Sequence, residues 1–428
     1  MFAILVHMEQ SLTLADVMHE IGIFVAVPIL AVIAWNVWLS YIQTLFLRSI
    51  KWVIIEVKPP KEVFKSPLAM ELVLNSLYAG GQGGDWYTKY WKGEVSLYSS
   101  LEIVSKEGSV HFYIRLPEKF KKTVEAQIYA QYPQAEVFEV SDYTSEFPDF
   151  KKGADFNLWG CNFILSKDDV YPIKSYIDYG LDKAIGSLDE EQRIDPITPL
   201  LEYIGSLNAN EHVWIQILIR PDTKRFTVKK KGVEEKGKDW KAKAAETITE
   251  LKANLYEKDE NGKPIITLTT KTQTNTFETI ERHADKFGFD SFIRAVYIAK
   301  GPAFNAGTRA PALIGAFRQF NSSQLNGFKP DGTTKVDFPW QDMFGNKIAG
   351  MKAKLLGGYK ARAFFYGGFD PLSFGDYFTN PNESGGKPYI LSTEELATIF
   401  HLPGRVAETP SFTRIEATKA EPPANLPI

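Results

Sequence analysis

The sequence predicts an α+β fold in which one N-terminal transmembrane helix precedes two βαββαβ-type modules and a helical C-terminal part. Three observations lead to this prediction. A long apolar run lies near the N-terminus, the order of strand-like and helix-like segments recurs in the two halves of the remaining chain, and helical patterns follow the second half.

The first predicted element is a transmembrane helix over residues 21–47. This run, IGIFVAVPILAVIAWNVWLSYIQTLFL, contains no Asp, Glu, Lys, Arg or His and exceeds the roughly 20 apolar residues that cross a bilayer. Polar residues in its second half place the span itself over about residues 21–39. Aromatic residues of the kind that anchor helices at membrane surfaces lie around this boundary, namely Trp35, Trp38 and Tyr41. The alternative is a buried helix of a soluble core, which rarely runs so long without a charge.

The residues on either side of the span predict its orientation. No Lys or Arg precedes it, whereas several follow closely: Arg48, Lys51, Lys58, Lys61 and Lys65. The positive-inside rule therefore places residues 1–20 outside the cell membrane and the bulk of this single-pass protein in the cytoplasm. A cleavable signal peptide would need a basic start and a small-residue cleavage site. Since neither occurs, we expect the helix to remain as an anchor in the lipid bilayer.

The composition is that of ordinary globular material beyond the anchor. The chain has 428 residues, of which 44% are hydrophobic and 24% charged, and its net charge of −3 indicates no overall attraction to nucleic acid. Its one cysteine, Cys161, cannot form an intramolecular disulfide, which fits a reducing compartment. Because Cys161 lies in an apolar run, we interpret it as a small core residue and not as a nucleophile.

The first module is predicted over residues 51–145. Strand-like runs occupy residues 52–57, 96–104, 110–116 and 135–140. Helices are predicted after Ser66-Pro67 and after Pro117, where apolar residues recur at helical spacing. The order is β-α-β-β-α-β, which is that of a ferredoxin-like domain.

The second module is predicted over residues 155–305 as a diverged copy. Strands are expected at 156–165, 213–219 and 292–299, and helices at 196–207 and 274–287. Both halves contain a strand that ends in Ile-Arg and then reaches Pro, at 114–117 and 219–221. A basic insertion at 224–259 interrupts this copy. A helical and loop region at 306–408 and a Pro-rich tail at 409–428 complete the chain. Within that region we expect a helix at 348–365 that Gly357-Gly358 breaks and a long loop at 370–387. A capping box of Ser392 and Glu395 then begins the last helix.

Two surface features are candidates for binding. The insertion begins with basic residues that could contact phosphate, lipid headgroups or, weakly, DNA: Lys224, Arg225, Lys229, Lys230 and Lys231. A solvated, mobile charge run is the favoured alternative, because no aromatic residues interleave to stack bases. The second feature is an aromatic cluster that suits a membrane surface or a partner interface, although packing within its own domain is equally expected: Trp86, Tyr87, Tyr90 and Trp91.

The sequence lacks several common catalytic and metal-binding motifs. The chain has no GxxxxGK followed by Ser or Thr, no GxSxG, and no HxxxH or HExxH pair among its scattered histidines. We therefore predict no catalytic, cofactor-binding or metal-binding residue and expect a non-enzyme. Carboxylates distant in sequence can still meet in space, so a membrane-tethered enzyme with an unrecognised site stays as an alternative, as does a lipid or nucleic-acid binding module that uses residues 224–243.

The order of several short sequence segments resembles the order found in a known group of proteins. WVIIEVKPP, SLEIVSKEGSVHFYIRLPEKFKKTVEAQIYAQYP, a run ending in IQILIRP, LSTEELATIFHLPG and EPPANLP follow the anchor in this order. This order is similar to the membrane-anchored region that precedes the motor in type IV secretion coupling proteins and HerA-like conjugation ATPases of small-genome candidate-phyla bacteria. In longer relatives the last two of these segments lead into the ATPase domain, whereas this sequence stops there.

The resemblance implies an assembly or scaffold role. ATP hydrolysis does not carry over, since no ATP-binding residue matches. What it implies is a membrane-anchored component of a type IV secretion-like or DNA-translocation machine, with a HerA-like or coupling-protein-like ATPase supplied by a separate chain. Because such motors act as rings, a homo-oligomer is a further expectation of the resemblance.

Overall fold

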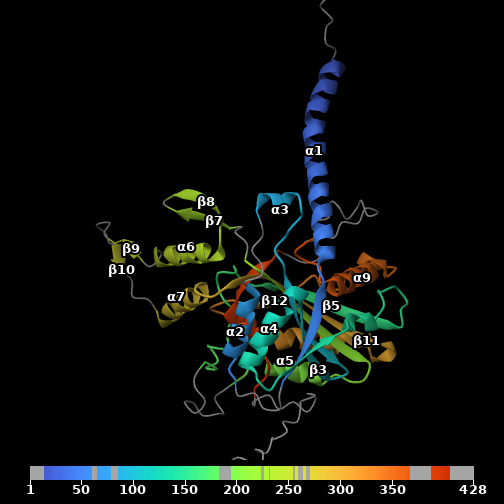
Figure 1. The fold of residues 1–428 in the computed structure, drawn as a ribbon, viewed down its shortest axis with the longest axis vertical. Coiled ribbons are helices and arrows are strands. Elements are labelled where there is room, and N and C mark those ends of the chain that lie inside the picture. The colour runs from blue at the N-terminus through green and yellow to red at the C-terminus, as the bar shows by residue number, and fades with distance from the viewer. Residues whose placement is uncertain are drawn as a thin grey trace, which may run out of the picture. The chain divides into compact units, whose positions relative to one another are not determined.

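The computed structural model describes most of the chain, which divides into two compact units (Figure 1). The described residues are 14–59, 65–78, 85–182, 194–222, 226–230, 232–253, 256–258, 264–266, 270–366 and 387–404. Of these, residues 14–49 and 85–95 form the first unit, and all others belong to the second. The predicted tail at 409–428 and most of the predicted loop at 370–387 lie outside the described residues.

The first unit consists of a long helix and a short one. Helix α1 (Leu14–Ser49) runs without interruption through Pro28, and α3 (Trp86–Tyr90) is a single short helix. Within the described part of the chain, α1 is the one helix long and apolar enough to cross a membrane, over Ala26–Ser49. Only 11% of the most apolar stretch of α1 is buried. The core helix of a soluble protein, in contrast, is mostly buried. The predicted apolar N-terminal helix is thus confirmed.

The second unit is built on one antiparallel sheet of nine strands. The order across the sheet is β12-β5-β11-β6-β2-β3-β1-β4, and β13 pairs with the end of β11. The strands are β1 (Trp52–Lys58), β2 (Ser99–Lys106), β3 (Ser109–Pro117), β4 (Glu136–Val140), β5 (Phe156–Leu165), β6 (Glu211–Pro221), β11 (Gly288–Lys300), β12 (Phe328–Asp331) and β13 (Tyr389–Ser392).

This single sheet corrects the prediction of two separate modules. The strands expected for each module are present, but β2 of the first half pairs along its length with β6 of the second, from Ser99 opposite Ile219 to Lys106 opposite His212. An edge strand exposes unpaired backbone groups, and pairing the two edges removes both of them. The two halves therefore share one sheet and its hydrophobic core.

The roles of two elements in the second half also differ from prediction. Strand β11 does not close a module at its edge but lies between β5 and β6, and twelve of its thirteen residues are buried. Helix α7 (Lys271–Ala284) packs against α6 (Trp240–Ala253) of the insertion. The edge position is taken by β12. This strand was not predicted, because it has only four residues and lies in a stretch rich in turn-forming residues.

Helices cover one face of the sheet. The helices that contribute buried side chains to this face are α2 (Leu68–Tyr78), α4 (Glu118–Gln131), α5 (Thr198–Gly205), α8 (Ala306–Ala316) and α10 (Thr393–Ile399). They pack on Val, Ile, Leu and Phe side chains that alternate along the strands, as a half-buried sheet requires. The predicted capping box of α10 is confirmed, with Ser392 accepting from the Glu395 amide and Glu395 accepting from the Ser392 amide.

The opposite face of the sheet, called the covered face below, lies under α9 (Asn346–Ala361) and the 3-10 turn η1 (Tyr143–Glu146). Helix α9 passes through Gly357 and Gly358, where the sequence predicted a break, and ends at Arg362. Its close approach to β5 requires Gly160, because a Cβ atom there would lie 2.4 Å from Leu355 Cδ2. The C-terminal part of the chain is therefore integral to the sheet domain.

Candidate functional site

A row of polar side chains crosses the middle of the covered face. The central strands each place one polar residue among apolar neighbours, and the strand register sets these residues directly opposite one another. The row consists of Glu56, Tyr113, Glu102, Gln216, Arg294 and Asn162. All are buried or nearly so. Five strand spacings of about 4.8 Å make the row about 24 Å long.

Glu102 is the centre of this row. Its carboxylate accepts hydrogen bonds from Ser100 Oγ at 2.6 Å and Tyr143 Oη at 2.7 Å. It also accepts one from Gln216 Nε2 at 3.0 Å. Arg362 donates two more, from Nε at 3.0 Å and Nη2 at 3.2 Å. Since a carboxylate offers about four lone-pair positions, these five donors occupy it completely.

Arg362 fixes the end of α9 over the row. Its backbone adopts a left-handed conformation with φ +51°, and its side chain is 1% exposed. Besides Glu102, the guanidinium donates to both carboxylate oxygens of Asp142, from Nη2 at 3.0 Å and from Nη1. Burial alone would raise the pKa of Glu102, but Arg362 and the other donors hold it below its ordinary value. Glu102 is therefore an ionised, fully paired group.

Arg294, the neighbour of Gln216 in the row, is buried beside this pair. Its Nη2 donates to the Ala363 carbonyl at 2.7 Å, and its guanidinium lies 5.0 Å from the Phe292 ring. Burial lowers the pKa of Arg294 to about 10, while Tyr359 and Glu102 oppose that shift. Arg294 therefore remains charged at neutral pH, and together with Arg362 it balances Glu102 and Asp142.

A second buried network holds α10. His283 Nε2 lies 3.1 Å from Glu394 Oε1, and His283 Nδ1 lies 2.7 Å from Ser392 Oγ. Burial would lower the pKa of His283, but the two carboxylates of Glu394 and Glu395 raise it to about 9. Burial would raise the pKa of Glu394, but His283 and its other partners lower it to about 2. At neutral pH the network is a buried ion pair that joins α7 to α10.

The chemistry of both networks is structural. Proton transfer to a substrate needs a titratable group that a bound molecule can reach, whereas Glu102 and Glu394 are fully buried and fully bonded. Removing one partner from such a buried pair strongly destabilises a protein, because the remaining charge is left without compensation. These networks therefore fix α9 and α10 on the sheet.

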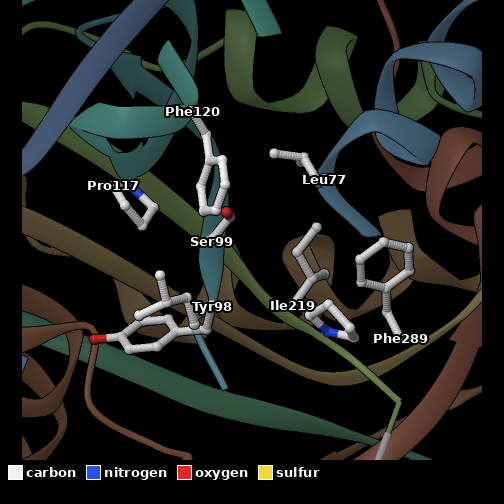
Figure 2. A pocket seen from close by; sticks show the side chains of 9 residues that line it. Leu77, Tyr98, Ser99, Pro117, Phe120, Ile219 and Phe289 are labelled. Carbon is white, nitrogen blue, oxygen red and sulfur yellow. The ribbon is translucent and has the colours of Figure 1, made fainter. Parts of the chain in front are cut away.

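The described cavities differ in size and in their opening to solvent. One of about 400 Å³ is lined by residues 152–157 and by Ile348, Ala349 and Lys352 of α9. Figure 2 shows Leu77, Phe120, Ile219 and Phe289 around a cavity of about 10 Å³, which is the room of one water molecule. A hollow of about 670 Å³ beside α9 is open to solvent, and its charged groups pair within the protein, as in the 2.9 Å contact of Lys360 with Asp149. Pockets for small molecules are more enclosed and mostly apolar.

Two of the five basic residues singled out from the sequence lie on a described β-hairpin. Strands β7 (Phe226–Lys230) and β8 (Val233–Lys238) pair, with Lys229 opposite Glu234. Lys229 and Lys230 are on β7, while Lys224, Arg225 and Lys231 lie outside the described residues. The sequence favours a solvated, mobile charge run here, and that reading stays a prediction, whereas the β-hairpin itself was not predicted. The alternation in Phe226-Thr-Val and the Gly232 that follows were the missed signal.

The aromatic cluster lies in the first unit. Trp86, Tyr87 and Tyr90 belong to α3 and Trp91 follows it directly. Asp85 caps the helix by accepting from the Thr88 amide at 2.9 Å. Tyr90 lies near α1, with its ring centroid 6.0 Å from that of Trp35. Packing within the cluster's own unit thus involves Tyr90, while its neighbours present exposed rings.

The two networks could not be recognised from the sequence, although each leaves a trace there. Glu102, Gln216 and Arg294 each interrupt an apolar strand with one polar residue, in SLEIV, VWIQILI and FIRAVYIA. That pattern identifies buried polar groups but not their partners. Asp142 and Arg362 lie in irregular segments without any such pattern.

Comparison with known protein families gives one match. Residues 40–340 match a family described as a domain of unknown function, DUF8128. This range begins near the end of α1, includes every strand from β1 to β12 and ends before α9. It covers well over half of the chain, so the chain belongs to the DUF8128 family. No curated protein matches the chain.

Proposed function

We propose that this chain, a member of the DUF8128 family, is a membrane-anchored, non-enzymatic assembly component of a type IV secretion-like or DNA-translocation machine. In this proposal α1 crosses the cell membrane once, the N-terminus lies outside, and the sheet domain lies in the cytoplasm. The motor is a separate HerA-like or coupling-protein-like ATPase that docks on the Pro-rich segment 409–428 of the chain.

The observation that carries the proposal is the exposed apolar surface of α1 in a chain that also contains a folded sheet domain. Val27, Ile29 and Leu30 are each more than half exposed, which water would penalise and lipid would favour. Only two residues separate α1 from β1. The basic residues after the span, beginning with Arg48 and Lys51, support the cytoplasmic side.

The construction of the sheet domain supports a platform more than a catalyst. Two networks of buried charges hold α9 and α10 on opposite faces of one sheet. Other buried carboxylates also pair within the domain, as Glu211 does with Arg309 and Asp290 with Arg220. Elements fixed in this way present a constant outer surface to a partner, which lowers the entropic cost of binding. A scaffold needs such a surface, whereas an enzyme also needs accessible reacting groups.

The strand order supports an origin from two ferredoxin-like copies. In the first half the strands run β4-β1-β3-β2, and in the second half β12-β5-β11-β6. The second order reproduces the first if β5, β6, β11 and β12 correspond to β1, β2, β3 and β4. We infer that two diverged copies joined through β2 and β6 and that residues between β6 and β11 were inserted.

Co-purification of the intact protein tests the partner. The full chain is cross-linked in the cells that make it, extracted in mild detergent and analysed by mass spectrometry. We expect a P-loop ATPase with the full chain and a loss of that ATPase when residues 409–428 are deleted. An ATPase whose P-loop lysine is changed to alanine should still be captured, because docking does not require hydrolysis.

Other results would overturn the proposal. Recovery of the chain in the supernatant after carbonate washing would contradict the claim that α1 anchors the chain in the membrane. Equal recovery of the ATPase with the full and shortened chains would remove the tail as its docking segment. Capture without any P-loop ATPase, together with turnover of a metabolite by the purified chain, would favour the membrane-tethered enzyme.

A further inference from the structure

The segment that contains α3 exposes several large aromatic side chains. Trp86 is 70% exposed, Trp91 55% and Tyr87 46%. A folded domain in water normally covers such rings, and exposed aromatic clusters mark interaction surfaces. Tryptophan and tyrosine are also the residues that are enriched where a membrane meets water, because their rings are apolar and carry one polar group.

Direct contacts join this segment to α1. The indole nitrogen of Trp38 donates to the Tyr90 carbonyl at 3.3 Å, and the rings of Trp35 and Tyr90 are 6.0 Å apart. Gly93 lies against the backbone of Ile42 so closely that a Cβ atom there would be 2.4 Å from the Ile42 carbonyl oxygen. Residues 85–95 and the second half of α1 thus form one structure within the first unit.

These contacts fix the level of the segment relative to the apolar span. The span over residues 21–39 is about 28 Å long at 1.5 Å per residue, close to the thickness of the hydrocarbon core. Trp35, Trp38 and Tyr41 lie at its C-terminal end and are each more than two-fifths exposed. Since Tyr90 contacts Trp35 and Trp38, α3 lies at the level where the hydrocarbon core gives way to headgroups.

We propose that residues 86–91 insert their aromatic rings into the headgroup region of the bilayer, beside Trp35, Trp38 and Tyr41 of α1. The inference rests on the proposed membrane span of α1. The occupant of this surface is the lipid of the leaflet at the C-terminal end of α1. The protein then has two points of membrane contact, which restrict the rotation and tilt of the anchor more than a single helix does.

The charges of the segment indicate which lipid property matters. Asp85 and Glu94 offset Lys89 and Lys92, so the segment has no net charge. Lys89 Nζ lies 5.4 Å from the Tyr90 ring centroid and Lys92 Nζ 5.8 Å from that of Tyr87. The contact therefore depends on aromatic insertion, and anionic lipid should add little to it.

Depth-dependent quenching tests the inference on the full chain in vesicles. Single cysteines replace Trp86, Trp91 or, as a reporter of the span, Val32, and carry an environment-sensitive dye. Cys161 does not interfere, because it is buried and its pKa is raised to about 12 by that burial. Vesicles of phosphatidylcholine, with or without phosphatidylglycerol, contain lipid with a nitroxide either at the headgroup or deep in the acyl chain.

We expect the dyes at Trp86 and Trp91 to be quenched at least twofold more by the headgroup nitroxide than by the deep one, equally in both lipid mixtures. The dye at Val32 should show the reverse order. Alanine at Trp86 and Tyr87 should at least halve the quenching at Trp91. A dye in place of Trp340, an exposed residue of the second unit, measures how far the dye itself seeks lipid.

The outcomes distinguish a failure of aromatic insertion by residues 86–91 from a failure of the proposed membrane span of α1. Deep quenching at Val32 without quenching at Trp86 and Trp91 would overturn the inference and leave the membrane span intact. Absence of quenching at Val32 would overturn the span itself. Equal quenching at Trp340 and Trp86 would assign the signal to the dye and overturn the inference, as would quenching that appears only with phosphatidylglycerol.

Discussion

The guanidinium of Arg362 donates a hydrogen bond to each carboxylate oxygen of Glu102, although the two residues are 260 positions apart in the chain. Arg362 follows α9 directly, and Glu102 lies in the middle of β2. The match to the DUF8128 family ends at residue 340. This buried pair therefore fastens the part of the chain beyond the family domain to the centre of the family's sheet.

Replacing Glu102 by alanine should destabilise the protein strongly. The change leaves Arg362 buried with one carboxylate partner fewer, and breaking buried pairs of this kind costs about 3–5 kcal/mol. Urea unfolding of the full chain in detergent, followed by tryptophan fluorescence, measures the loss. The control is Glu118→Ala, which removes the exposed ion pair with Lys51 and should have a much smaller effect. Similar losses for both variants would contradict a special role of the buried pair.

The His283 network predicts a stability that depends on pH. The pKa of His283 is raised from 6.5 to about 9. The contribution of His283 to the free energy of unfolding is therefore complete below about pH 6.5 and is lost as the pH rises through 9. Glu394 acts in the opposite direction, since its pKa is lowered to about 2 and its contribution is lost only as the pH falls through that value. We expect wild type and His283→Gln to differ in unfolding free energy at pH 6 and to converge above pH 9. A difference that does not change with pH would contradict a charged His283.

A methyl group at Gly93 should separate residues 85–95 from α1. Gly93 has φ +70° and abuts Ile42, whereas Gly153 has a similar φ of +85° but no atom within 4 Å of an added Cβ. Gly93→Ala therefore adds a steric clash to backbone strain, while Gly153→Ala adds strain alone. Spin labels at Leu45 and Trp91, both exposed, report the distance between α1 and the segment. We expect a longer and broader distance distribution for Gly93→Ala only, and identical distributions would refute the packing.

Charge reversal in the β7–β8 hairpin should leave membrane and DNA retention unchanged. The change replaces Lys229, Lys230 and Lys231 by glutamate in a hairpin whose second strand carries Glu234 and Glu235. Vesicle flotation and gel shifts at low salt measure the effect, with Lys119, Lys122 and Lys252 reversed as a control of equal charge. A loss confined to the hairpin variant would favour a lipid or nucleic-acid binding module and weaken the scaffold proposal.

Local pattern predicted much of the secondary structure. The apolar run gave α1, alternation gave the long strands, and Ser or Pro at helix starts gave α2, α4 and α10, because these signals are contained within a few neighbouring residues. Short elements were not predicted, for the same reason. Strand β12, with four residues, and the β7–β8 hairpin have too few residues to display a period against their turn-forming or charged neighbours.

The sequence by itself determined that an apolar helix precedes an α+β chain, and that Glu102, Gln216 and Arg294 each interrupt a strand. Only the tertiary structure decided that these residues share one row, that β2 pairs with β6, and that Arg362 ends its helix over Glu102. The physical reason is that strand pairing and buried ion pairs join positions far apart in the chain. Their energy depends on register and desolvation, which no local pattern records.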